Sequence, residues 1–289
     1  MRYLVTGAAG QLGSKVVDAL LESMPPEQVA VSVRNPEKAD SLRARGIDVR
    51  RGDFDDPDSL AKAFAGVERL LIISTSGDNA TRLRQHGTAV AEAARAGVGF
   101  IAYTSLARAD ASPMSLGEVH RATEEAIRAT GIPFSLLRNN WYVENEAGSI
   151  QGAAAGAPVV TAAGDGRVGW ASREDLARAA AAVLAGAGHE NTVYELSGRP
   201  RPYADLAGAI GEVLGRSVPL EQVDDATYER RLNEYGLPRF LVELLVDSQR
   251  AMRQGALDVE SGDLERLLGR PATTLTESVA RILESPRSG

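Results

Sequence analysis

Short apolar runs alternate with stretches of helical periodicity through the first half of the chain. Six runs rich in β-branched and aliphatic residues have the length and composition of strands: 2–5, 29–33, 47–50, 69–74, 100–104 and 133–137. Because helical stretches separate them, the pattern predicts an α/β fold with a doubly wound parallel sheet and right-handed crossovers.

The helices between these runs carry recognisable end signals. Pro57 stands at a helix N1 position, and Ser115 with Glu118 three residues later has the form of a capping box. One side of the helix predicted over 80–96 is expected to be buried through Leu83, Val90 and Ala94. The helices expected here are 36–45, 57–66, 80–96 and 115–131.

After Arg138 the pattern changes. Residues 147–166 are rich in glycine and alanine, and Ser172 is expected to cap an alanine-rich helix. A strand at 193–196 is expected to rejoin the main sheet, before helices at 203–214, 238–253, 264–268 and 274–283. We therefore expect a first domain at 1–140, rejoined by about 172–198. A smaller, mostly helical lobe formed by 141–171 and 199–289 is expected over the carboxyl edge of the sheet.

Three glycines at a spacing of three separate the first strand from the first helix: Gly7, Gly10 and Gly13. Gly7 allows a sharp exit from the strand, Gly10 lets the backbone close on a pyrophosphate, and Gly13 lets the helix lie close against the sheet. The phosphates would meet the N–H groups and macrodipole of the helix N-terminus. An ordinary strand-to-helix turn is the alternative. The immediate change of periodicity favours a dinucleotide site, so residues 1–140 are predicted to be a Rossmann domain.

The end of the second strand indicates which dinucleotide binds. A cofactor without a 2′-phosphate is usually held there by a carboxylate, whereas this chain has Arg34 and then Lys38. A guanidinium can fork onto a phosphate and stack on adenine, so we predict NADPH over NADH. A solvated surface arginine is the alternative. Asp53 is expected either to contact the adenine amino group or to cap the helix near Pro57.

Composition and charge argue against several classes of function. The net charge of −7 over 289 residues argues against nucleic acid or an anionic membrane as the main partner. The chain has no cysteine and only three widely separated histidines, so we expect neither thiolate chemistry nor a metal site. No apolar run approaches the roughly 20 residues of a membrane helix, and a strand stands where a signal segment would lie. We expect a cytoplasmic protein without membrane insertion.

The helix after the fifth strand lacks the general acid of short-chain dehydrogenases. Those enzymes carry Tyr-x-x-x-Lys there; the tyrosine protonates a substrate oxygen, and the lysine binds the nicotinamide ribose and lowers the tyrosine pKa. Here the frame has Leu116 and His120, followed by Glu124. His120 is expected to hydrogen-bond the nicotinamide ribose in place of the lysine. An exposed pair with Glu124 on the same helix face is the alternative.

The missing tyrosine favours an acceptor that needs no acid from the protein. A quinone or similar planar conjugated acceptor becomes a stabilised phenolate when it receives hydride, and solvent can protonate that phenolate. The protein must then hold nicotinamide C4 about 3–3.5 Å from an electrophilic carbon in a mostly apolar slot. We therefore predict hydride transfer from NADPH to a small quinone-like acceptor, without flavin or metal.

Segments along the whole chain resemble the NmrA-like branch of atypical short-chain dehydrogenases. They include VTGAAGQLG, VSVRNPEKA, FIAYTSL, GIPFSLLRNNWYVEN, AAGDGR, GHENTVYEL and RPATTLTESV. The helix with His120, Thr123 and Glu124 belongs to the same resemblance. Within this branch, the chain is similar to the flavin-independent bacterial NAD(P)H:quinone oxidoreductases of type 2. The resemblance implies NADPH bound by the glycine turn and Arg34, with the pocket closed by the segment after the sixth strand.

The resemblance also implies roles for individual residues. The pyrophosphate would be held by Gly7, Gly10, Gln11, Leu12 and Gly13. The residues expected along the cofactor are Ser74, Thr75, Thr104 and Ser105. Those expected at the reacting end are His120, Tyr142 and Asn145. Asn140 replaces an expected glycine and is predicted to narrow the mouth of the pocket.

Several alternatives remain open at this point. Trp141 and Tyr142 could pack between the lobes instead of meeting the acceptor. Arg138 is expected to anchor the sheet edge or a helix C-terminus, and Arg173 and Asp175 to belong to a helix cap. Reduction of triphenylmethane-type dyes, or a non-catalytic NADP(H)-binding redox sensor, would also suit these residues. A homodimer is one possible assembly.

Overall fold

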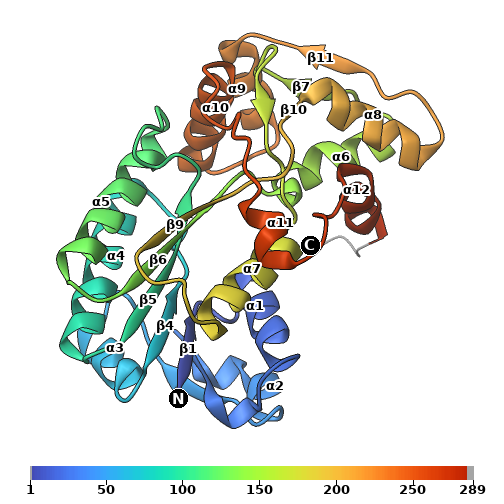
Figure 1. Ribbon diagram of the computed structural model, residues 1–289. Coiled ribbons are helices and arrows are strands. Elements are labelled where there is room, and N and C mark those ends of the chain that lie inside the picture. Colours follow the sequence, from blue (N-terminus) through green and yellow to red (C-terminus); the bar gives the residue numbers. More distant parts are fainter. Residues whose placement is uncertain (1, 285–289) are drawn as a thin grey trace.

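A seven-stranded parallel sheet forms the centre of the molecule (Figure 1), and the computed structural model describes residues 2–284. The strands lie in the order β3-β2-β1-β4-β5-β6-β9, which reverses between β1 and β4. All neighbours are parallel. The bounds are β1 Tyr3–Thr6, β2 Val29–Val33, β3 Asp48–Arg51, β4 Arg69–Ile72, β5 Phe100–Leu106, β6 Phe134–Asn139 and β9 Thr192–Leu196. The predicted doubly wound sheet is confirmed, and the strand expected near 193–196 does rejoin it.

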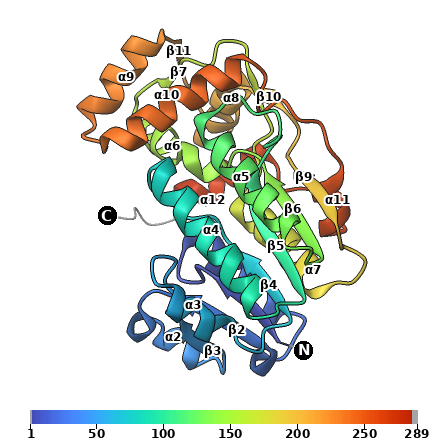
Figure 2. The same ribbon diagram turned by 90° about the vertical axis from the view of Figure 1, so that its left-hand side faces the viewer.

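Helices cover both faces of this sheet (Figure 2). One face packs against α3 Pro57–Phe64, α4 Asn79–Arg95 and α5 Ser115–Ala129. The other packs against α1 Gln11–Leu21, α2 Asp40–Arg43, α7 Arg173–Ala185 and α11 Asp263–Leu268. Leu264 of α11 is fully buried in this second core, so part of the predicted 199–289 lobe lies on the large sheet.

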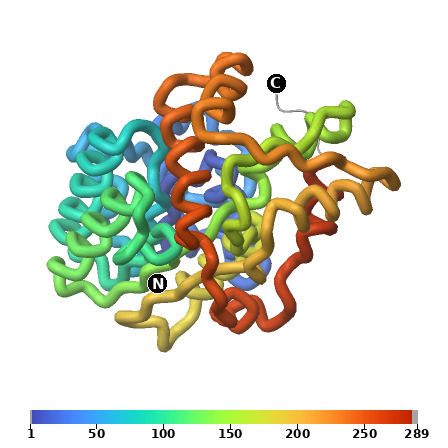
Figure 3. Tube along the Cα trace, turned by 90° about the horizontal axis from the view of Figure 1, so that it is seen from above, coloured from blue at the N-terminus to red at the C-terminus, as the bar shows by residue number. Residues whose placement is uncertain are grey.

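A smaller lobe stands over the carboxyl edge of the sheet and is viewed from above in Figure 3. Its strands are β7 Val159–Thr161, paired with β11 Leu220–Gln222, and β8 Arg167–Val168, paired with β10 Arg201–Pro202. Its helices are α6 Ala147–Ala154, α8 Tyr203–Leu214, α9 Asp225–Glu234, α10 Arg239–Arg253 and α12 Leu275–Glu284. Helices α6 and α9 were not predicted. The four short strands were not predicted either, because segments of two or three residues carry no readable periodicity. Within residues 2–284, no helix combines the length and apolarity that a bilayer span requires.

Several predicted helix ends are confirmed. Pro57 is the first residue of α3, and Ser172 accepts a hydrogen bond from the Asp175 N–H at 3.1 Å. Asp175 does more than cap: it is fully buried and accepts hydrogen bonds from the Thr273 N–H at 2.7 Å and from Arg270 at 2.6 Å. The segment before α12 is therefore fastened to the start of α7.

Two helix predictions are wrong. The helix predicted over 36–45 is broken into a 3₁₀ turn at Pro36–Lys38 and the four-residue α2. Ser115 is the first residue of α5, not its cap. The Ser115 N–H instead donates to a carboxylate oxygen of Asp247 on α10, at 2.8 Å. A carboxylate distant in sequence has replaced the local cap, which no local pattern could reveal. The other 3₁₀ turns are Pro26–Gln28 and Val143–Glu146.

The buried face of α4 also differs from the prediction. Leu83 is 42% exposed and Ala94 is exposed, whereas only Val90 of the predicted set is buried. The buried face instead includes Arg82 and His86. Because three of its members, Arg82, His86 and Glu92, are polar, the hydrophobic pattern pointed to the wrong side of the helix.

Two histidine rings lie inside the molecule, on adjacent helices. His86 on α4 is fully buried and His120 on α5 is 3% exposed, with their ring centroids 6.4 Å apart. The pKa of His86 is lowered to about 4, mainly by burial and to a smaller extent by the charge of Arg82. The pKa of His120 is lowered to about 3, mainly by burial, with smaller contributions from His86 and Arg82. Both rings are therefore neutral at pH 7.

These lowered pKa values predict a loss of stability in mild acid. In the unfolded chain each histidine binds a proton near pH 6.5, whereas in the folded protein it does so only near pH 4 or below. Acid therefore favours the unfolded chain between those limits. We expect the free energy of unfolding, measured in urea, to be roughly 2 to 4 kcal/mol lower at pH 5 than at pH 7. A flat profile over this window would contradict the burial of both neutral rings.

Candidate functional site

The candidate site lies at the carboxyl edge of the sheet, where β1, β2, β4, β5 and β6 end beneath the smaller lobe (Figure 1). In open parallel sheets, ligands bind at this edge, where the strand order reverses. The glycine turn follows β1 directly, so it stands at the reversal between β1 and β4.

The geometry of the glycine turn depends on missing side chains. Gly7 has φ +62°, in the left-handed region that favours glycine. A Cβ on Gly13 would lie 2.3 Å from the Gly7 carbonyl oxygen, and one on Gly10 would lie 3.1 Å from the same atom. Gly13 thus permits a close approach of α1 to the turn itself, which corrects the expectation of contact with the sheet.

The first turn of α1 is open at its N-terminus. Gly10 is the cap residue and has no side chain that could cap the helix. Its N–H donates to the Gly7 carbonyl, and its own carbonyl accepts from the Ser14 N–H, so the backbone alone joins the turn to the helix. Gln11 is exposed and Leu12 is buried. Uncapped first-turn N–H groups form the anion-binding end of a helix.

The residues predicted to select the dinucleotide stand after β2 and β3. Arg34 and Lys38 are exposed, and Arg34 makes no hydrogen bond or ion pair within the described residues. Its charge nevertheless reaches Asp55, whose pKa is lowered mainly by a hydrogen bond from Arg84 and to a smaller extent by Arg34. Asp53 accepts a hydrogen bond from the Asp55 N–H at 3.0 Å.

Asp53 is not the helix cap that one alternative assigned to it. The cap of α3 is Asp56, which accepts a hydrogen bond from the Ser59 N–H at 3.2 Å. Asp53 is half-buried beside this cap and keeps the adenine contact as its remaining predicted role.

Hydroxyl groups link the ends of β4 and β5. Thr104 Oγ1 accepts a hydrogen bond from the Ser74 N–H at 2.9 Å and donates to the Ser74 hydroxyl at 3.3 Å. Thr75 donates its N–H to His86 Nε2 at 3.0 Å. Ser105 donates instead to Glu124 at 2.6 Å, away from the Ser74 pair. The four predicted residues thus fall into three separate groups: Ser74 with Thr104, Thr75 with His86, and Ser105 with Glu124.

His120 lies in a buried polar cluster at the start of α5. Its Nδ1 is 2.8 Å from the hydroxyl oxygen of Tyr103, which is itself 3.3 Å from His86 Nδ1. His86 Nδ1 is 3.0 Å from the Thr123 hydroxyl oxygen. Burial raises the pKa of Tyr103 well above its ordinary value, so its hydroxyl keeps its proton.

Glu124 belongs to a buried ion cluster and not to an exposed pair with His120, so that alternative is wrong. Arg138 of β6 binds both oxygens of Glu124, with Nε 2.9 Å from Oε1 and Nη2 2.7 Å from Oε2. Its Nη1 also donates to Asp110 and Glu195. The prediction that Arg138 anchors the sheet edge is confirmed.

The segment after β6 presents a second set of polar groups. Asn139 donates from Nδ2 to the Tyr142 hydroxyl at 3.2 Å, while its Oδ1 is buried and has no hydrogen-bond partner within residues 2–284. Tyr142 is half-buried, and the Arg173 guanidinium lies 5.0 Å from its ring centroid. Arg173 also donates to Asn145, which is exposed, so Arg173 acts beyond the predicted helix cap.

Asn140 and Trp141 face inward. Asn140 is buried and donates to the Ser197 hydroxyl at 3.0 Å and to the Leu257 carbonyl at 3.1 Å. It therefore ties β6 to the smaller lobe, which corrects the prediction that it narrows the pocket mouth. Trp141 is buried in the core of the lobe and donates to Glu146 at 3.0 Å, in agreement with a packing role.

Reasoning from the sequence missed three polar residues of this region: His86, Tyr103 and Asn139. His86 and Tyr103 lie in a predicted helix and a predicted strand, where an isolated polar side chain is usually taken as exposed, and Asn139 lies just beyond the strand predicted over 133–137. A tyrosine inside the apolar run at 100–104 was the available signal, since a buried tyrosine hydroxyl requires a partner.

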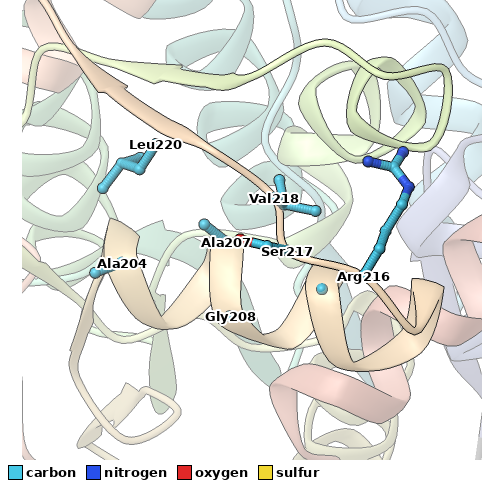
Figure 4. A pocket seen from close by; sticks show the side chains of 8 residues that line it. Ala204, Ala207, Gly208, Arg216, Ser217, Val218 and Leu220 are labelled. Carbon is cyan, nitrogen blue, oxygen red and sulfur yellow. The ribbon is translucent and has the colours of Figure 1, made fainter.

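A groove of about 450 Å³ lies elsewhere, in the smaller lobe (Figure 4). It is lined by α8 and by the segment that leads into β11, including Gly208, Arg216 and Leu220. None of the predicted site residues lines it. Within residues 2–284, no cluster of histidine and carboxylate side chains could hold a metal ion.

Comparison with known proteins shows which family has this sequence and fold. A family model described as NAD(P)H-binding matches residues 7–187. Quinone oxidoreductase 2 of Escherichia coli is 42% identical over 279 residues, which are 96% of this chain and 97% of that protein. Its structure in complex with NADPH gives a TM-score of 0.93 and covers 98% of this chain and 100% of that chain.

Two further relatives extend the comparison. The triphenylmethane reductase of Citrobacter sp., in complex with NADP(H), is 39% identical with a TM-score of 0.93, covering 98% of this chain and 100% of that one. An NmrA-like family domain-containing oxidoreductase of Aspergillus flavus is 30% identical over 99% of this chain and 96% of its own length. The chain therefore belongs to the NAD(P)H-binding family, in its NmrA-like branch.

Proposed function

We propose that the protein is an NADPH-dependent oxidoreductase that transfers hydride to quinones or similar planar conjugated acceptors. One observation carries the proposal: neither residue in place of the usual Tyr-Lys pair can act as an acid near pH 7, because the tyrosine position holds Leu116 and the lysine position holds the buried His120. His120 is neutral there, and the pKa of Tyr103 is raised well above its ordinary value. An acceptor that becomes a stabilised phenolate suits such a site, and relatives named as a quinone oxidoreductase and a triphenylmethane reductase support it.

The chain offers a fitting set of groups for the phosphate end of NADPH. The uncapped start of α1, with the glycine turn before it, would hold the pyrophosphate through Gly7, Gly10, Gln11, Leu12 and Gly13. Arg34 would fork onto the 2′-phosphate, assisted by Lys38, because its guanidinium has no other partner within the described residues. Asp53 would contact the adenine amino group.

The nicotinamide end has a second set of groups. Asn139 Oδ1 is a buried acceptor without a donor inside residues 2–284, and the carboxamide NH₂ of nicotinamide would satisfy it. His120 would hydrogen-bond the nicotinamide ribose. The residues that line the cofactor would be the predicted Ser74, Thr75, Thr104 and Ser105. The Ser105 hydroxyl already donates a hydrogen bond to Glu124, so it could only accept one from the cofactor.

The reaction asks little of the protein beyond position. Bound NADPH supplies the hydride from its nicotinamide ring. The Tyr142 ring, held by Asn139 and Arg173, would form one wall of the acceptor slot, and Asn145 would stand at its rim. A quinone accepts hydride at a ring atom or oxygen, and one proton from solvent completes the two-electron reduction to the hydroquinone.

The expectations of a cytoplasmic location and of a homodimer stay predictions. Neither is needed for the chemistry proposed here, because every group named above belongs to one chain.

The main prediction concerns turnover. Purified protein mixed with NADPH and a panel of quinones should oxidise NADPH, followed as loss of absorbance at the nicotinamide band. A matched Gly13→Val variant, whose side chain would collide with the Gly7 carbonyl, should lose this activity together with NADPH binding. Tight NADPH binding without turnover of any quinone would remove the enzyme proposal and favour a redox sensor. If the protein oxidised NADPH with triphenylmethane dyes but with no quinone, it would be an enzyme whose substrates are those dyes instead of quinones.

A second prediction concerns the 2′-phosphate. Arg34→Ala should raise the Kd for NADPH about tenfold or more, the effect of losing a charge-assisted hydrogen bond, and should barely change the Kd for NADH. Isothermal titration of both nucleotides measures the ratio. Arg45→Ala is the matched control, because Arg45 is already engaged with Asp18 at 2.7 Å. Equal weakening of both nucleotides would exclude the phosphate role.

A third prediction concerns the ribose. His120→Ala should weaken NADPH binding about fivefold, the approximate effect of one neutral hydrogen bond, and should lower turnover. The control is His189→Ala, since His189 pairs with Tyr194 outside the site. If His120→Ala folds and both its NADPH affinity and its turnover match those of the parent, then His120 does not contact the cofactor.

A further inference from the structure

The backbone of Thr75 determines where His86 carries its proton. The Thr75 N–H points at His86 Nε2 at 3.0 Å, and the Thr75 hydroxyl oxygen lies 3.2 Å from the same nitrogen. Because a backbone N–H can only donate, Nε2 is the bare nitrogen, and the Thr75 hydroxyl donates to it as well. His86 is neutral, and its proton therefore lies on Nδ1. This proton is donated to the Thr123 hydroxyl oxygen at 3.0 Å, since the Thr123 hydroxyl donates its own proton to the Val119 carbonyl at 2.7 Å.

The proton of Tyr103 then has one place to go. The hydroxyl oxygen of Tyr103 lies 3.3 Å from His86 Nδ1, which already carries a proton and cannot accept another. Its shortest hydrogen bond is to His120 Nδ1, at 2.8 Å. The Thr123 hydroxyl also acts on Tyr103 as a hydrogen-bond partner, but it is already engaged with His86 Nδ1 and with the Val119 carbonyl. Tyr103 therefore donates to His120 Nδ1. The reverse arrangement, with the proton on His120 Nδ1, would leave the buried Tyr103 proton with no acceptor except the already engaged Thr123 hydroxyl.

We infer that Tyr103 and His86 are positioning residues that lock His120 in the tautomer with its proton on Nε2. Within residues 2–284, Nε2–H has no hydrogen-bond partner. It is not among the fully buried atoms that lack one, so it lies at the small exposed part of His120, a residue that is 3% exposed in total. The lock thus prepares a donor that needs an oxygen from outside the chain. If the proposed function holds, that oxygen is a hydroxyl of the nicotinamide ribose, the role a lysine ammonium would otherwise fill.

The lock also connects two strands of the site. Thr75 follows β4, Tyr103 is in β5, and His120 is on α5, so the tautomer of His120 depends on the placement of the backbone after β4. A neutral donor set in this way keeps its proton across the neutral pH range, whereas a free histidine would exchange between two tautomers.

The inference is tested by nitrogen-15 NMR of the full-length protein labelled at histidine. The chain has only three histidines, so His189→Ala identifies the third set of signals. At pH 7, with and without NADPH, we expect a bare Nε2 in His86 and a bare Nδ1 in His120. A protonated Nδ1 in His120, or a mixture of tautomers, would overturn the inference even if no variant folds.

Tyr103→Phe provides the second test. The variant should leave His86 in its tautomer, release His120 into a mixture, and weaken NADPH binding about three- to tenfold, the range for one hydrogen bond. Tyr194→Phe is the matched control: it removes the same hydroxyl from a second tyrosine–histidine pair, 2.7 Å long, and should change neither His120 nor NADPH affinity. An unchanged His120 tautomer in Tyr103→Phe would refute the lock.

The outcomes separate this inference from the proposed function. Locked tautomers with NADPH binding and no quinone turnover would support the lock and reject the reductase. Quinone turnover with His120 protonated on Nδ1 would support the reductase and reject the lock.

Discussion

The buried ion pair between Arg138 and Glu124 is the interaction on which the site depends. Arg138 is in β6, Glu124 is on α5, and both side chains are less than a tenth exposed. Removing one partner of such a pair typically costs about 3–5 kcal/mol, because the other charge is left buried. Glu124 lies one helical turn from His120, so the pair sets the depth and rotation of α5 against the sheet. The orientation of His120 follows from that placement.

The same pair explains the division of labour at the end of β5. Successive residues of a strand point to opposite sides, so Thr104 faces Ser74 while Ser105 faces Glu124. The Thr104 hydroxyl therefore helps to shape the proposed cofactor side, and the Ser105 hydroxyl donates a hydrogen bond to the buried Glu124 carboxylate. Two adjacent residues that resemble one another in the sequence have different physical roles.

Much of the sheet could be predicted from sequence, because its central strands β1, β2, β4 and β5 are mostly apolar runs and the glycine turn has local causes in Gly7 and Gly13. The errors occurred where polar groups are buried or where partners are distant. The inward side of α4 carries Arg82 and His86, and α5 is capped by Asp247, 132 residues away. The roles of His86 and Tyr103 depend on contacts between elements, which residue spacing alone does not contain.

The fastening of Asp175 to Arg270 and Thr273 has a consequence for the order in which the molecule is assembled. Asp175 lies in the first turn of α7, and α7 packs along α1, the helix that starts at the glycine turn. During synthesis the first strand and α1 emerge from the ribosome long before residues 263–284. The glycine turn, although encoded first, can reach its final support only after almost all of the chain has been made.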